Sequence, residues 1–151
     1  MKRQISHTIE IEAGPAEVWA IVEATASFPT WNPFIRKLEG ELRTGAKLAV
    51  LIEPPGRRKS TFRPTVLAAE PARELRWIGR VLIPRIFDGE HSFLLEPTAS
   101  GGTMFTQGEH FSGILVRLFS GTIDSTELGF KQMNEALKAR AEGVRHGSSR
   151  G

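Results

Sequence analysis

The chain of 151 residues contains neither cysteine nor tyrosine. The lack of cysteine excludes disulfides, thiolate metal sites and a cysteine nucleophile, and it fits a cytoplasmic protein. The lack of tyrosine removes a phenolic acid or oxyanion donor from any catalytic site. The histidines are scattered without ligand spacing such as His-x-x-x-His, and no Gly-rich loop joins a strand to a helix. We therefore expect no metal and no cofactor.

Long apolar runs are absent too. No uninterrupted run approaches the roughly 18 residues of a membrane-spanning helix, and no apolar block follows the charged start as it would in a signal peptide. We expect no integral membrane association. Basic residues exceed acidic ones by only three, and the one basic cluster, Arg57–Lys59, lies beside the turn Pro54–Gly56. A solvated hairpin tip explains this cluster better than a nucleic-acid surface, because acidic residues are interspersed elsewhere.

What the chain does contain is a series of predicted strands that ends in one amphipathic helix. Residues 5–12 alternate between apolar and polar positions, which predicts a strand with one buried face. A short helix is predicted at 15–22, followed by an aromatic loop or helical turn at 27–34 that contains two prolines. Period-two patterns then predict strands near 35–42, 46–53, 59–69, 74–82, 88–96 and 103–112. The short turns between them imply antiparallel neighbours.

The last predicted element is a long helix after Gly113. Its apolar residues recur at helical spacing, so they fall on one stripe that must pack on the sheet; they are Leu115, Phe119, Ile123, Phe130, Met133, Leu137 and Ala141. We expect one domain over residues 1–142. Residues 143–151 have nothing to bury, which predicts a disordered C-terminal tail.

The order of these segments resembles the START-related, helix-grip superfamily, which includes polyketide cyclase/dehydrase and lipid-transport proteins. The segments that carry the likeness are Pro15–Trp19, Phe28–Phe34, Glu74–Trp77, Glu90–Phe93, Gly102–Phe105 and Phe111–Gly113. The resemblance implies an α+β helix-grip fold, in which a curved antiparallel sheet of about seven strands wraps a long C-terminal helix over an apolar cavity. It leaves the function open, because many activities share this fold.

Strand alternation indicates which side chains face that cavity. We expect a ligand-binding wall made of Trp77, His91, Phe93, Phe105, Gln107 and Glu109 from the sheet and Phe130, Met133 and Leu137 from the helix, with Trp31 and Phe34 at the mouth. A stripe such as the one on the helix is more often packed core than ligand wall. For Trp77 and Phe93 both roles apply.

Three of these residues, His91, Gln107 and Glu109, are polar and need partners, because burying an unpaired carboxylate costs several kcal/mol. They form a satisfied internal network, or they orient the polar end of a bound molecule. In a third alternative, a β-bulge turns them outward.

The leading hypothesis is a protein that binds a small hydrophobic or amphipathic molecule, such as a lipid, isoprenoid or polyketide-like compound, in its internal cavity. The alternative is an enzyme of the cyclase/dehydrase kind with His91 and Glu109 as acid and base. A second alternative is a chaperone-type module that acts on a partner protein. The ligand and the oligomeric state stay open, a homodimer included.

Overall fold

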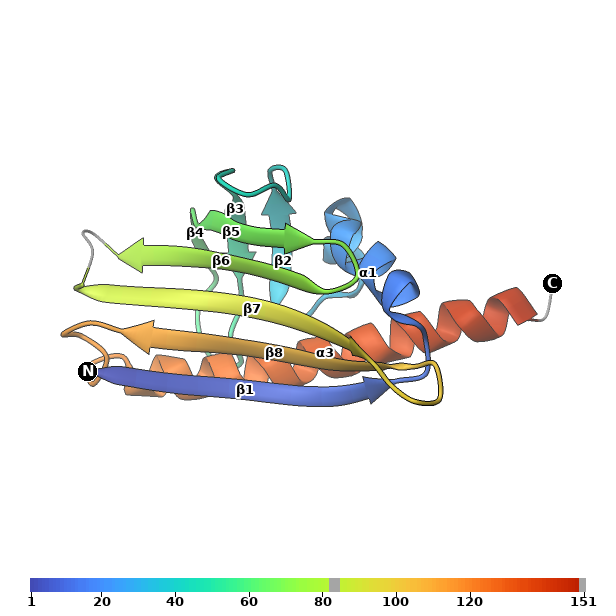
Figure 1. Ribbon diagram of the computed structural model, residues 1–151. Helices are drawn as coiled ribbons and strands as arrows, with labels where there is room; N and C mark the ends of the chain where they lie inside the picture. Colours follow the sequence, from blue (N-terminus) through green and yellow to red (C-terminus); the bar gives the residue numbers. More distant parts are fainter. Residues whose placement is uncertain (82–84, 150–151) are drawn as a thin grey trace.

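The computed structural model of the chain describes residues 1–81 and 85–149. Its antiparallel strands form a large sheet in the order β1-β8-β7-β6-β5 and a small sheet in the order β2-β3-β4 (Figure 1). The strands are β1 Lys2–Ile11, β2 Ile35–Glu39, β3 Ala49–Ile52, β4 Ser60–Phe62, β5 Thr65–Glu70, β6 Glu74–Val81, β7 Phe87–Pro97 and β8 Thr103–Ser112. The helices are α1 Pro15–Glu23, α2 Phe28–Trp31 and α3 Ser120–Ser149, with a 3-10 turn at Thr25–Ser27.

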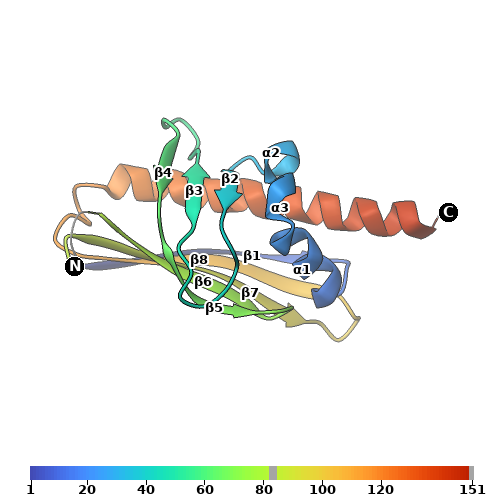
Figure 2. The same ribbon diagram turned by 90° about the horizontal axis from the view of Figure 1, so that it is seen from above.

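Helix α3 runs along one face of the large sheet, and the small sheet reaches from the β5 edge towards the helix (Figure 2). This arrangement confirms the predicted α+β helix-grip fold. The described residues contain eight strands rather than about seven, because the predicted strand 59–69 divides into β4 and β5. The division falls at Arg63 and Pro64, since proline has no N–H to donate to a sheet.

The inner face of the large sheet carries the residues that alternation predicts. Strands β7 and β8 pair without interruption, with His91 opposite Glu109 and Phe93 opposite Gln107. Phe93 is 1% exposed, and Gln107 is fully buried. The absence of a register shift between these two described strands makes the bulge alternative wrong.

Helix α3 begins later than its apolar spacing predicts. Residues 114–119 form turns instead, and Gly113 before them has a φ of +121°. A Cβ on Gly113 would lie 2.4 Å from the carbonyl oxygen of Ile86. The amides of Ile114 and Leu115 donate to the carbonyls of Arg85 and Ile86, so this segment is held against the start of β7 before the helix can begin.

The other end of α3 also differs from the prediction. The helix continues through Ser149, so most of the tail predicted to be disordered, residues 143–151, has a helical backbone. Extending an existing helix gains one hydrogen bond for each residue ordered and needs no apolar contact. Residues 150 and 151, like residue 82 of the predicted strand 74–82, lie outside the described residues. The domain limits of 1–142 stay a prediction.

No helix in the described ranges is both long enough and apolar enough to cross a lipid bilayer.

Close packing between α3 and the loop after α2 depends on a glycine. A Cβ on Gly129 would lie 2.3 Å from a ring carbon of Phe34. Phe34 is 2% exposed and meets Phe130 edge-on, with ring centroids 5.6 Å apart. The helix can therefore approach this ring only because residue 129 has no side chain.

We expect Gly129→Ala to lower the free energy of unfolding by about 1–3 kcal/mol, because the added methyl group forces the Phe34 ring to move. Gly143→Ala on the same helix is the matched control. No atom lies within 4 Å of a Cβ there, so alanine should add up to about 1 kcal/mol of stability. Chemical denaturation of both variants measures the difference. Equal stability of the two would contradict the close approach.

Candidate functional site

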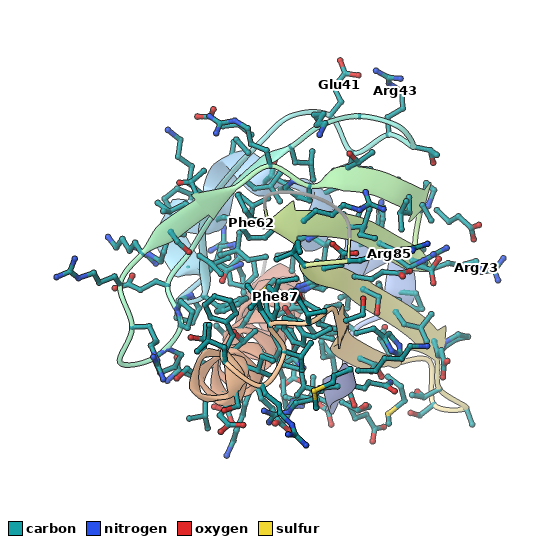
Figure 3. All side chains as sticks on the ribbon, turned by 90° about the vertical axis from the view of Figure 1, so that its left-hand side faces the viewer. Glu41, Arg43, Phe62, Arg73, Arg85 and Phe87 are labelled. Atoms are coloured by element: carbon teal, nitrogen blue, oxygen red, sulfur yellow. The ribbon has the colours of Figure 1, made fainter. Side chains whose placement is uncertain are left out.

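A cavity of about 310 Å³ lies between the large sheet, the small sheet and the first turns of α3. The large sheet supplies Trp77, Gly79, Arg80, Phe87, Gly89, His91, Glu109 and Phe111. The small sheet and the residue before it supply Phe34, Ile35, Ile52, Ser60 and Phe62, and the segment entering α3 supplies Phe119, Thr122, Ile123 and Thr126. Phe62 and Phe87 lie in this space between the sheets and the helix (Figure 3). The walls are thus mostly apolar.

Missing side chains help to create the cavity. Gly79 and Gly89 are register partners in β6 and β7, and both line the cavity. Two adjacent inward positions of the sheet therefore carry no side chain. The first turns of α3 add the small side chains of Thr122 and Thr126 opposite them, which keeps the helix from filling the space.

Four of the residues predicted for the site line this cavity, namely Phe34, Trp77, His91 and Glu109. Phe93, Phe105, Gln107, Phe130, Met133 and Leu137 are buried and belong to the packed interior. Trp31 lies beside a different hollow with Ile21 and Arg140. For the helix stripe, the geometry favours the core alternative, and a ligand contact by these other residues stays a prediction.

Sequence reasoning missed other lining residues, among them Phe62, Phe87, Phe111, Phe119 and Ile123. Phe87 and Phe111 follow the same alternation as His91 and Glu109, so the signal for them was present. What alternation does not reveal is the position along the strands at which the cavity lies. The cavity sits at the end where α3 begins, whereas Met133 and Leu137 pack further along the helix.

A buried chain of hydrogen bonds reaches the cavity wall at His91. The His91 ring is 3% exposed and stacks on Trp77 with centroids 4.9 Å apart. Its Nδ1 lies 3.1 Å from Glu109 Oε1, and its Nε2 lies 3.0 Å from Gln107 Oε1. Gln107 Nε2 donates to Asn134 Oδ1 at 2.9 Å, and Asn134 Nδ2 donates to the main-chain oxygen of His7 at 2.8 Å. The predicted internal network therefore exists, with Asn134 and His7 as further members.

The His7 end sets the direction of this chain, because a main-chain carbonyl oxygen only accepts hydrogen bonds. The Asn134 group facing it must be the amide nitrogen, which leaves Asn134 Oδ1 to accept from Gln107 Nε2. Gln107 Oε1 then faces His91 Nε2, so that ring nitrogen carries a hydrogen. Amide and tautomer orientations are assigned in this way from their partners.

The contact between His91 Nδ1 and Glu109 therefore needs one further proton. If Nε2 alone were protonated, the lone pair of Nδ1 would face a carboxylate oxygen, and two acceptors would oppose each other. The pair is satisfied as imidazolium and carboxylate, or as neutral imidazole and protonated carboxyl group. Both residues line the cavity, so a bound molecule meets a pair that holds a transferable proton.

Glu109 owes its position to Gly89. A Cβ on Gly89 would lie 2.2 Å from Glu109 Oε2, so the carboxylate occupies the space that any other residue would fill. A second polar atom is available nearby, because the indole nitrogen of Trp77 is buried and has no hydrogen-bond partner among the described residues. Since Trp77 also lines the cavity, this wall combines a proton-holding pair with a spare donor.

The comparisons with known proteins agree with this architecture. The profile of the family described as polyketide cyclase / dehydrase and lipid transport matches residues 2–142, and the chain belongs to this family. No curated protein is similar enough in sequence to count as a match.

Several solved structures share the fold at low sequence identity. A START superfamily protein from Mycobacterium smegmatis is 18% identical, with a TM-score of 0.73 over 93% of this chain and 98% of that one. The Zhui aromatase/cyclase from Streptomyces sp. R1128 is 15% identical, with a TM-score of 0.72 over 94% of each chain. A norcoclaurine synthase mutant from Thalictrum flavum is 14% identical, with a TM-score of 0.71 over 96% and 97%. These likenesses confirm the helix-grip fold.

The direction of the hydrogen-bond chain can be tested by ¹⁵N NMR of the His91 ring. We expect Nε2 to be protonated throughout the pH range in which the protein is folded, because Gln107 Oε1 accepts from it. In Gln107→Leu this preference should disappear, and stability should fall by about 1–3 kcal/mol because buried groups lose their partners. Gln4→Leu, at an exposed position on β1, is the control. A bare Nε2 in the unsubstituted protein would refute the assignment.

Proposed function

We propose that the protein binds a small apolar molecule with one polar end, such as a polyketide-like or isoprenoid compound. The observation that carries this proposal is the His91–Glu109 pair in the wall of an otherwise apolar cavity. A few polar groups that converge on an apolar pocket are typical of sites that orient a ligand. Because the interior is hollow rather than filled, ligand binding is favoured over a chaperone-type partner module.

The volume narrows the class of ligand. A cavity of about 150 Å³ takes a benzene ring, so 310 Å³ suits a compound of roughly two fused rings. A long-chain lipid would need more space. Relatives of the same fold support an aromatic ligand, because a norcoclaurine synthase from Thalictrum flavum has been solved in complex with dopamine and hydroxybenzaldehyde.

Titration calorimetry with 2-naphthol and naphthalene tests both halves of this proposal. We expect 2-naphthol to bind about tenfold more tightly, because its hydroxyl group makes a charge-assisted hydrogen bond to the polar pair. Glu109→Leu should remove this preference while naphthalene still binds. If both compounds bind equally to the unsubstituted protein, the polar pair does not orient the ligand.

A cavity-filling variant tests the location of the site. Thr126→Leu places a larger side chain in the cavity wall and should lower the affinity for 2-naphthol roughly tenfold. Thr8→Leu makes the same replacement at an exposed position of β1, beside Thr106, and should leave the affinity unchanged. Unchanged affinity in Thr126→Leu, with the fold intact, would place the binding site elsewhere.

The proton held between His91 and Glu109 favours a second function, acid–base catalysis of the cyclase/dehydrase kind. In this function Glu109 removes a proton from carbon next to a ligand carbonyl, and the His91–Glu109 pair returns a proton to oxygen. Both steps need a group that exchanges protons in a site sheltered from water.

Hydrogen–deuterium exchange at the α-carbon of 2-tetralone, a two-ring ketone, separates catalysis from binding alone. If the pair is catalytic, the protein accelerates exchange in D₂O, and Glu109→Gln slows it about 100-fold while 2-tetralone still binds. NMR follows the loss of the α-proton signals. Equal exchange rates with the two proteins would restrict the site to binding.

A further inference from the structure

One end of the molecule presents large apolar side chains to solvent beside basic ones. There β1 begins, β6 is followed by β7, and β8 leads into α3 (Figure 1). Ile114 is 70% exposed and Leu118 is 72% exposed, and Met1 beside them is 58% exposed. Main-chain hydrogen bonds join these segments, because Gly113 donates to Met1 at 3.1 Å and Ile114 donates to Arg85 at 3.2 Å.

The turns before α3 separate inward from outward side chains. Ile114 and Leu118 are four residues apart in a helix-like segment, in which the amide of Phe119 donates to the carbonyl of Leu115. Residues at this spacing share one side. Val116 of the same segment is 4% exposed. The two apolar side chains on the outer side are therefore an added feature, since the core is closed without them.

Basic side chains surround this pair. Lys2, Arg85 and Arg117 are exposed, and none of the three forms an ion pair with another described residue. The acidic side chains of the adjoining segments are already engaged, because Asp124 pairs with Arg3, and Asp88 accepts from the amide of Arg85 and faces Arg80. Two apolar and three basic residues, Ile114, Leu118, Lys2, Arg85 and Arg117, define what is called the docking end below.

We propose that the docking end binds the surface of an anionic lipid bilayer. Isolated apolar side chains insert at the boundary between head groups and acyl chains, while neighbouring cations bind anionic head groups. A stable protein interface requires about 800 Å² from each partner and a core depleted of charge. Two apolar side chains inside a ring of unpaired cations fit the lipid surface better.

The position of the docking end relates it to the cavity. Phe119 follows Leu118 directly, Phe87 follows Arg85 by two residues, and both phenylalanines line the cavity. A docked molecule would hold this part of the cavity next to the bilayer, where apolar compounds concentrate. That use of docking rests on the proposed ligand binding, whereas docking itself does not.

Flotation of the full chain with vesicles tests the proposal. We expect binding to vesicles of phosphatidylcholine mixed with phosphatidylglycerol and little binding to phosphatidylcholine alone. Ile114→Ser combined with Leu118→Ser should lower binding to the mixed vesicles about tenfold. Arg85→Gln combined with Arg117→Gln should lower it about fivefold for each charge removed, and added salt should weaken what remains.

Two controls match these variants. Leu128→Ser removes an apolar side chain that is 56% exposed on α3, and Arg73→Gln removes a cation in the turn between β5 and β6, at the opposite end of the large sheet (Figure 1). Arg73 lies apart from Arg85 in Figure 3 as well. Both controls should bind vesicles like the unsubstituted protein. Losses equal to those of the docking-end variants, or no preference for anionic vesicles, would overturn the proposal.

Measurements without vesicles keep the remaining outcomes apart. The docking-end variants leave all lining residues in place, so their affinity for 2-naphthol should equal that of the unsubstituted protein. If vesicles bind but 2-naphthol does not, the proposed function fails and docking stands. If sedimentation equilibrium shows a dimer that the Ile114 and Leu118 changes abolish, the surface serves a second copy of the chain, and the lipid proposal is wrong.

Discussion

The hydrogen-bond chain that starts at the His7 carbonyl is the constraint on which much of this structure depends. Asn134 of α3 lies between β1 and β8 and bonds to both. Each of these buried groups would cost about 1–3 kcal/mol without its partner, so the helix cannot slide along the sheet without breaking several of them. Apolar contacts alone are less directional, because their energy depends on the area buried rather than on the alignment of particular atoms.

Once α3 is held in this register, the positions of both core and cavity follow. Phe130, Met133 and Leu137 pack against the inner face of the sheet and are fully buried. The earlier turns carry threonines, which face the Gly79–Gly89 pair across the cavity. Large residues therefore meet the sheet on one side of the fixed contact, and small ones meet glycines on the other. The same polar chain that anchors the helix also ends in the His91–Glu109 pair, which links the stability of the fold to the chemistry of the cavity wall.

Sequence patterns predict the sheet and its inner face well, because alternation along an antiparallel strand is a local property. The inward positions of His91, Phe93 and Gln107 follow from it, since β7 and β8 pair without a bulge. The start of α3 could not be found in this way. Leu115 and Phe119 have helical spacing, yet the amides of residues 114 and 115 bond to the segment before β7, a contact between segments distant in sequence.

The candidate site was only partly predictable for the same reason. Alternation assigns a face to each residue, but the location of a cavity depends on which small residues meet across the fold. The pairing of Gly79 with Gly89 became visible only with the strand register. Asn134 did leave a signal, because it lies four residues after Phe130 and three before Leu137 and thus falls on the apolar stripe. A lone amide on such a stripe needs a buried partner, which is a stronger indication of a polar site than the aromatic residues around it.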